Sequence, residues 1–248
     1  MATDIEEMSE FTEIEVEEIL ETENKKDTVN PYKFNGLQLI APAVLLGVGI
    51  AGVSSHGLRH LNREIADKIG PINHKKFGIE NFTIFVPALA AYGLNLCGVK
   101  GLHNYAELSV IMGTAYLLMA ATVFPTKEFV KSQRPTGFDY NSFPSGHTCV
   151  AFVGAEILRH EFWEVSPWIG VAGYLIAAGS GFMRIYNGAH WLTDVVAGAG
   201  LGILCAQAAY WLYPAITKHL FPSLYKANLF LSPAVSTKSI GLGASITF

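Results

Sequence analysis

The chain has 248 residues, of which 50% are hydrophobic and only 15% are charged. A soluble globular chain carries about 25% charged residues. The charge is also uneven, because residues 1–30 hold 11 of the 21 acidic residues and two of the 17 basic ones, a local net charge of −9. This composition excludes a disordered or collagen-like chain and fits a soluble enzyme poorly; it predicts an integral membrane protein.

The first segment, residues 1–33, is predicted to be an acidic tail that is partly helical or disordered. Its beginning lacks the positively charged region that a signal peptide requires. The first membrane span is therefore expected to serve as an uncleaved anchor.

Uncharged stretches dominate residues 34–213. Crossing about 30 Å of hydrocarbon takes roughly 20 helical residues. Five stretches that lack Asp, Glu, Lys and Arg have about this length: Phe34–Leu58, Asn81–Val99, Leu108–Thr126, Val165–Met183 and Val195–Thr217. A sixth helix is expected at Ser145–Leu158, with Glu156 buried or near the interface. The sequence thus predicts an all-α membrane protein, a six-transmembrane-helix bundle over residues 34–213.

Between the first two spans, apolar residues recur at three- and four-residue intervals: Leu58, Leu61, Ile65 and Ile69. This pattern predicts a helix in the membrane interface. His56, His60 and Glu64 are spaced by four and could share a face as metal ligands, but an exposed polar face gives the same pattern more often. The three cysteines fall inside expected spans and indicate buried apolar residues, so no disulfide or zinc framework is expected.

The last segment, residues 214–248, has a different pattern. Apolar residues alternate strictly with small or polar ones from Ser239 to Phe248. Alternation of this kind predicts a β-strand, which could pair with Asn228–Val235 as a short C-terminal β-hairpin.

Polar residues beside membrane spans are costly and usually functional, and here they form three clusters. The clusters contain Lys127 and Arg134 after the third span, Pro144–His147 at the start of the fourth, and Arg184–Asp194 between the fifth and sixth. Because spans alternate in direction, these ends lie on one membrane face. All three clusters are therefore expected to form one site.

The residue types in these clusters suit phosphoryl transfer without a metal or cofactor. Three cations, Lys127, Arg134 and Arg184, can hold phosphate oxygens. Ser145 and Gly146 would lie at a helix N-terminus, which favours an anion.

Three further side chains can carry the chemistry. His190 and Asp194 are spaced by four, so the carboxylate can hold one imidazole nitrogen as N–H and leave the other free to attack. His147 can protonate a leaving oxygen. Taken singly, the cations could be interface residues and the histidine–aspartate pair structural; their combination on one face favours a site.

This pattern resembles the signature of the type-2 phosphatidic acid phosphatase superfamily: Lys127, Arg134, Pro135, Pro144, Ser145, Gly146, His147, Arg184, His190 and Asp194. The resemblance implies a lipid phosphate phosphatase in which His190 is the nucleophile that forms a phosphohistidine, Asp194 its partner and His147 the acid for the leaving group. Lys127, Arg134, Ser145, Gly146 and Arg184 would hold the phosphoryl oxygens. Met183 departs from the family, which usually has Ser there, so a modest effect or a shifted substrate preference is expected.

The substrate class follows from a site at the membrane boundary flanked by Phe143, Tyr186 and Trp191. The expected partners are membrane lipids and a phosphate carried on a lipid, with no nucleic acid; the sequence does not fix the oligomeric state. Lipid A or undecaprenyl diphosphate is favoured by the resemblance, and phosphatidylglycerophosphate or phosphatidic acid is possible. The expected location is the bacterial cytoplasmic membrane, with the site facing the periplasm. Basic residues divide too evenly between the two faces to fix that orientation.

Two other functions stay open at this point. A lipid phosphotransferase would use the same residues and differ only in its acceptor. A non-catalytic anion-binding membrane protein or transporter would use the cations alone. A vanadium haloperoxidase shares the pattern, but its soluble architecture does not fit these spans.

Overall fold

The computed structural model describes residues 33–69 and 78–220, together with the backbone of 228–236 and 239–247. The chain divides into two units, residues 1–33 and 34–248. The predicted acidic tail lies outside the described residues, apart from Lys33. The description below concerns the second unit.

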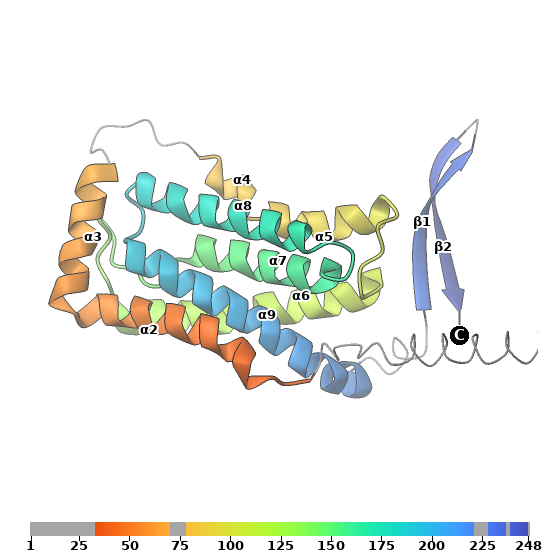
Figure 1. Ribbon diagram of the computed structural model, residues 1–248, viewed down its shortest axis with the longest axis horizontal. Helices are drawn as coiled ribbons and strands as arrows, with labels where there is room; N and C mark the ends of the chain where they lie inside the picture. Colours follow the sequence, from red (N-terminus) through yellow and green to blue (C-terminus); the bar gives the residue numbers. More distant parts are fainter. Residues whose placement is uncertain (1–32, 70–77, 221–227, 237–238, 248) are drawn as a thin grey trace, which may run out of the picture. The chain divides into compact units, whose positions relative to one another are not determined.

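The described elements are nine helices followed by two strands (Figure 1). In chain order they are η1 (Gly36–Leu39), α2 (Ile40–Ser54), α3 (His56–Ile69), α4 (Glu80–Thr83), α5 (Val86–Leu96), α6 (Tyr105–Val130), α7 (Gly146–Phe162), α8 (Pro167–Tyr186), α9 (Leu192–Leu220), β1 (Asn228–Ser236) and β2 (Ser239–Thr247).

The expected six-span bundle is wrong in its number of spans. Within the described residues, four helical segments are long and apolar enough to cross a membrane: Gly36–Ser54, Tyr105–Val130, Pro167–Tyr186 and Leu192–Leu220. The two other predicted spans correspond to helices that fall short of this length, α5 and α7.

The stretch Asn81–Val99 does not form one helix, for a local reason. Pro87 lies in the first turn of α5, where its missing N–H costs nothing, so a new helix begins there instead of continuing from α4. Gly98, with a φ of 87°, follows the end of α5. The resulting 11 residues reach only about 16 Å, roughly half of the hydrocarbon thickness.

Helix α7 has 17 residues and carries charge in its last two turns. It packs against α8, α9, α5 and α6, and Figure 1 shows it in the middle of the helical bundle. The carboxylate of Glu156, 1% exposed, accepts hydrogen bonds from Arg159, Tyr174 and Gln207. Glu161 accepts from Tyr210 at 2.6 Å in the same way. These partners allow charged side chains to lie inside the bundle.

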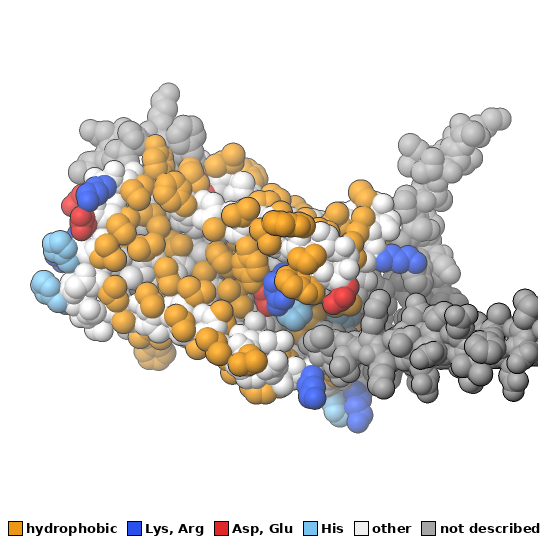
Figure 2. Space-filling model, viewed as in Figure 1, with side chains coloured by type: hydrophobic (Ala, Val, Ile, Leu, Met, Phe, Trp, Pro, Cys, Tyr) orange, Lys and Arg blue, Asp and Glu red, His pale blue; other side chains and the backbone are white. Residues whose placement is uncertain are grey.

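The outer surface of the helices is apolar. Large hydrophobic side chains are exposed along α2, α5, α6 and α8, among them Val44, Leu89, Leu117 and Leu175. Figure 2 shows hydrophobic side chains over most of the bundle face in that view, with charged side chains at the end where α3 lies. Such a surface suits contact with lipid tails and is costly in water.

Close helix packing depends on small residues. A Cβ on Gly198 would lie 2.5 Å from the carbonyl oxygen of Ser145, and one on Gly202 would lie 2.6 Å from that of Cys149. Glycine at both positions therefore lets α9 approach the start of α7. At the C-terminal end of the unit, β1 and β2 pair antiparallel, with Asn228 opposite Thr247 and Ser236 opposite Ser239.

Candidate active site

The three polar clusters lie at one end of the bundle. This end is formed by the last residue of α6, the first of α7, the last of α8 and the first of α9. It is the left end in Figure 1, where α3 also lies. The antiparallel arrangement of successive helices therefore brings together the residues that the sequence separates by more than sixty positions.

Lys127 lies in the last turn of α6 and ties that helix to the loop before α7. Its ammonium donates to the carbonyl oxygens of Asn141, at 2.6 Å, and Pro144, at 2.8 Å. An ammonium has three donors, so one remains for a ligand. The positive charge is thereby fixed beside the N-terminus of α7.

Arg134 belongs to the loop between α6 and α7. Its Nε lies 3.1 Å from a carboxylate oxygen of Asp139, and its backbone N–H donates to the Asp139 carbonyl at 2.8 Å. The contact with Asp139 orients the guanidinium of Arg134 through its Nε, and the terminal nitrogens Nη1 and Nη2 can bind an anion.

Ser145 and Gly146 form the N-terminus of α7, as the sequence predicts. The Ser145 backbone N–H donates to the carbonyl of Asp194 at 3.0 Å, and its hydroxyl accepts from Thr148 at 2.9 Å. The backbone N–H groups of the first turn of α7 therefore point towards the cluster, and the helix dipole favours an anion there.

His147 follows in the first turn of α7. Its Nε2 lies 3.0 Å from the side-chain oxygen of Asn81 in α4, so this nitrogen carries the proton and Nδ1 is the free one. Burial lowers the pKa of His147 to about 4, and the charge of Arg184 adds to this effect. His147 is thus neutral at pH 7.

Arg184, in the last turn of α8, contacts Glu80, the first residue of α4. Its Nη1 lies 3.2 Å from Glu80, whose same oxygen accepts from the Asn187 amide at 2.7 Å. Glu80 is 3% exposed. A buried carboxylate therefore fixes one edge of the guanidinium and partly balances its charge.

His190 is 2% exposed and lies just before α9. Its Nδ1 is 2.7 Å from the carbonyl oxygen of Ser142 and 3.8 Å from the Asp194 carboxylate. Because a carbonyl only accepts, Nδ1 carries the proton and Nε2 has the free lone pair. Burial lowers the pKa of His190, and the nearby charges of Lys127 and Arg184 add to this, against the opposing effect of Asp194.

Asp194 acts on His190 less directly than its spacing predicts. Its carboxylate accepts from the Ser142 hydroxyl at 2.5 Å and from the Trp191 backbone N–H at 3.0 Å. It therefore holds the loop residue whose carbonyl orients the imidazole. The reason is that His190 precedes the helix, so the two residues are not one turn apart on a helix face.

Three residues of the site were missed from the sequence: Glu80, Asn81 and Ser142. Glu80 is the charge that bounds an uncharged stretch, which is a weak signal for a functional carboxylate. The Ser142 carbonyl is a backbone group and has no signal in the sequence. Among the described residues, no group of three His, Cys, Asp or Glu side chains could hold a metal ion.

The sequence of this region matches a known family. Residues 120–218 match the sequence model of the PAP2 superfamily. The match covers 99 of the 248 residues. All eight site residues that the sequence predicts, from Lys127 to Asp194, lie inside it, and the resemblance stated from the motifs is confirmed. Glu80, Asn81 and α3 lie outside the matched residues.

Three relatives are similar to this chain. It is 37% identical over 135 residues to the lipid A 1-phosphatase of Porphyromonas gingivalis, which covers 54% of this chain and 30% of the relative. It is 37% identical over 87 residues to the bacitracin transport permease protein BcrC of Bacillus licheniformis, covering 35% and 41%. It is 29% identical over 100 residues to the undecaprenyl-diphosphatase of Sulfolobus acidocaldarius, covering 38% and 45%. The chain thus spans less than half the length of each relative. With its apolar spans, it is an integral membrane protein.

Proposed function

We propose that the chain is a membrane phosphatase that hydrolyses a phosphomonoester or diphosphate on a lipid through a phosphohistidine. The observation that carries the proposal is the hydrogen bond between His190 Nδ1 and the Ser142 carbonyl, 2.7 Å long. It leaves Nε2 as a nucleophile within a group of cations suited to a phosphoryl group.

The reaction has two steps. In the first, His190 Nε2 attacks phosphorus, the bond from phosphorus to the lipid oxygen breaks, and protonated His147 gives its proton to that oxygen. In the second, water attacks the phosphohistidine, neutral His147 takes a proton from the water, and the P–N bond breaks to release inorganic phosphate. Lys127, Arg134 and Arg184 offset the charge on the equatorial oxygens.

The low pKa of His147 fits this sequence of steps. Burial and the Arg184 charge lower its pKa to about 4. A bound phosphate brings negative charge that offsets the cations, so the pKa of His147 rises when substrate binds. The acid is thus protonated mainly in the complex. The rate profile is expected to be bell-shaped, with its acid limb set by His190, whose lowered pKa extends activity into acidic pH.

The proposed substrates are lipid A or undecaprenyl diphosphate first, with phosphatidylglycerophosphate and phosphatidic acid as further members of the class. The names of two relatives, a lipid A 1-phosphatase and an undecaprenyl-diphosphatase, support this choice. The proposed location is the bacterial cytoplasmic membrane, with the site facing the periplasm.

The test is phosphate release by the full chain, purified in detergent, from a panel of these lipids. His190→Ala is expected to lose more than about 1000-fold in kcat. His219→Ala, at the exposed far end of α9, is the matched control and should keep full activity. Equal turnover by the two variants would refute the proposal. Transfer of the phosphoryl group from the first lipid to a second lipid, without release of inorganic phosphate, would identify a phosphotransferase instead.

The orientation is tested separately in intact cells. Phe138, in the loop between α6 and α7, is 95% exposed. In a chain whose native Cys97 is replaced by Ser, Phe138→Cys should react with a membrane-impermeant maleimide added outside the cytoplasmic membrane. Lys218→Cys, near the far end of α9, should not react. The reverse pattern would place the site in the cytoplasm.

A further inference from the structure

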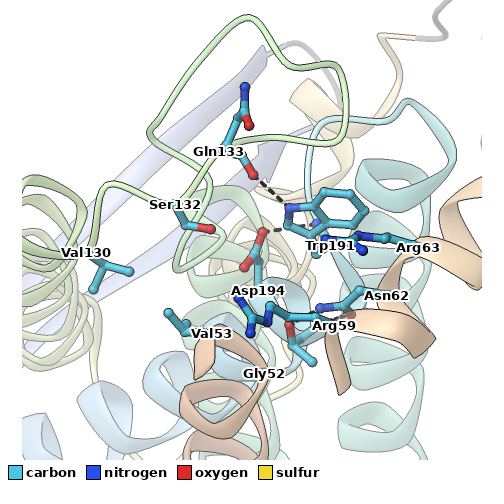
Figure 3. Close-up of a pocket in the computed structure, with 11 residues that line it drawn as sticks. Gly52, Val53, Arg59, Asn62, Arg63, Val130, Ser132, Gln133, Trp191 and Asp194 are labelled. Atoms are coloured by element: carbon cyan, nitrogen blue, oxygen red, sulfur yellow. Dashed lines mark hydrogen bonds between the residues drawn. The ribbon is translucent and has the colours of Figure 1, made fainter. Parts of the chain in front are cut away.

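A pocket lies beside the candidate active site. Its volume is about 360 Å³, and it is enclosed by the end of α2, by α3, by the residues after α6 and by the start of α9 (Figure 3). None of the three cations assigned to the scissile phosphate lines it. The pocket is therefore separate from the group of three cations, although its lining includes Asp194 and Trp191 of the candidate active site.

The walls of this pocket are held by specific contacts. The Asn62 amide donates to the Thr193 hydroxyl at 2.7 Å, and its oxygen accepts from the Thr193 backbone N–H at 3.2 Å. Asn62 is buried, so these bonds fix α3 against the start of α9. Across the pocket, the Trp191 indole N–H donates to the Gln133 carbonyl at 2.7 Å. Asn62 and Trp191 thus fix two walls of the pocket, whereas its two arginines, Arg59 and Arg63, are exposed.

Two arginines of α3 line the pocket. Arg59 and Arg63 are one helical turn apart, and Figure 3 shows both side chains extending from α3 towards the side where Trp191 and Asp194 lie. Neither makes an ion pair with any residue that the structure describes. By contrast, Lys68 on the same helix is paired with Glu64 at 2.7 Å. Among the described lining residues, Asp194 is the only acidic one; it is 2% exposed and already accepts two hydrogen bonds.

The position of the pocket defines what it can bind. The Asp194 carboxylate lines the pocket and lies 3.8 Å from His190 Nδ1. The attacking Nε2 is on the other side of the imidazole ring. A phosphate joined directly to the scissile one, as in a diphosphate, therefore remains on the Nε2 side. An anionic group that a headgroup unit separates from the scissile phosphate can extend past the imidazole ring to α3.

We infer that this Arg59–Arg63 pocket binds a second anionic group, a phosphate or carboxylate, on the headgroup of a lipid whose first phosphate lies at His190. This inference rests on the proposed function and narrows its substrate class to lipids with two separated anionic groups. Two guanidinium forks one turn apart match the oxygens of such a group. The volume of the pocket suits a polar headgroup fragment.

The test compares two substrates that differ only in the distal group: a bisphosphorylated glycolipid and the same lipid without its distal phosphate. The readout is the ratio of kcat/KM for the first to kcat/KM for the second. In the double variant Arg59→Gln with Arg63→Gln, this ratio should fall at least about tenfold. Lys68→Gln, which removes one positive charge from the same helix outside the pocket, is the control and should keep the ratio. A ratio in the double variant equal to that of the control overturns the inference.

Binding measured without turnover separates this inference from the proposed function. Full-length His190→Ala protein is titrated calorimetrically with the bisphosphorylated lipid and with inorganic phosphate, with and without the two arginine substitutions. Loss of lipid affinity in the arginine variant supports the pocket even if the unsubstituted protein releases no phosphate from any lipid, in which case only the proposed function fails. Lipid affinity that is unchanged, while inorganic phosphate binding is lost, marks a free-phosphate site and overturns the inference. Equal unfolding temperatures of the variants confirm that both fold.

Discussion

The contact between Asn81 and His147 offers a direct way to change the proposed acid. Replacing Asn81 with Asp keeps the size of the side chain and places a carboxylate 3.0 Å from His147 Nε2. An opposite charge at this distance contributes about 5 kcal/mol at an effective dielectric constant of about 20. This corresponds to a ceiling of about 4 pKa units. Opposite charges close to a titrating group in proteins usually shift its pKa by about 1 to 3 units.

The direction of the shift follows from which form of His147 the new charge favours. A carboxylate stabilises the imidazolium, so Asn81→Asp should raise the His147 pKa from about 4 by roughly 1 to 3 units. The alkaline limb of kcat should move to higher pH, since the acid stays protonated longer. KM should rise, because the added negative charge repels the phosphate.

The assay is an NMR titration of the His147 ring in detergent-solubilised protein, together with the pH profile of kcat. Asn95→Asp is the matched control, since Asn95 bonds Ala91 and Gly101 near the end of α5, away from the site. A His147 pKa in Asn81→Asp that stays within about half a unit of the unsubstituted protein would refute the assigned contact.

Three further substitutions test other parts of the account. Ser142→Ala removes the 2.5 Å donor to the buried Asp194 carboxylate but keeps the carbonyl that orients the nucleophile, so it should lower unfolding stability by about 1.5–3 kcal/mol while retaining measurable turnover. Glu156→Gln leaves Arg159 without its buried partner and should cost about 3–5 kcal/mol in stability, with kcat/KM of the folded protein unchanged, because the site lies at the other end of α7. Gly198→Ala places a methyl group 2.5 Å from a backbone oxygen at the start of α7 and should reduce both stability and kcat.

Unfolding temperatures and phosphate release in detergent measure all three, and the serine and glycine substitutions each have a matched control. Ser109→Ala removes an exposed hydroxyl that bonds the Tyr105 carbonyl and the Tyr92 hydroxyl. Gly57→Ala adds a methyl group with no described atom within 4 Å. A Ser142→Ala protein as stable as Ser109→Ala would contradict the role given to that hydroxyl. An inactive but stably folded Glu156→Gln protein would mean that the polar cluster in α7 takes part in turnover. Full stability of Gly198→Ala would contradict the close approach of α9.

Sequence spacing predicts the site residues well because they lie at helix ends and in short loops. Ser145 and Gly146 start α7, and Arg184 lies in the last turn of α8, as the motifs imply. Because short loops connect antiparallel helices, the ends of these helices must lie close together. Glu80 has no such constraint. It meets Arg184 across 104 positions of the chain, and neither residue indicates the other in the sequence.

The number of spans shows a second limit of the sequence. A run of uncharged residues gives the length that a span could have, but not whether one helix continues through it. Pro87 starts a new helix inside such a run. In α7, Glu156 and Arg159 satisfy each other inside the bundle, so burial by neighbouring helices, rather than contact with lipid, decides their environment. Both outcomes depend on tertiary packing, which hydropathy alone does not report.

The central claim is that His190 Nε2 carries the phosphoryl group during turnover. Full-length protein is mixed with a lipid phosphate, quenched with base within one turnover and digested for mass spectrometry. The account predicts a base-stable, acid-labile phosphate on His190, formed before inorganic phosphate appears and absent in His190→Ala. Phosphate release at the normal rate with no modified histidine, or with the label on another residue, would contradict it.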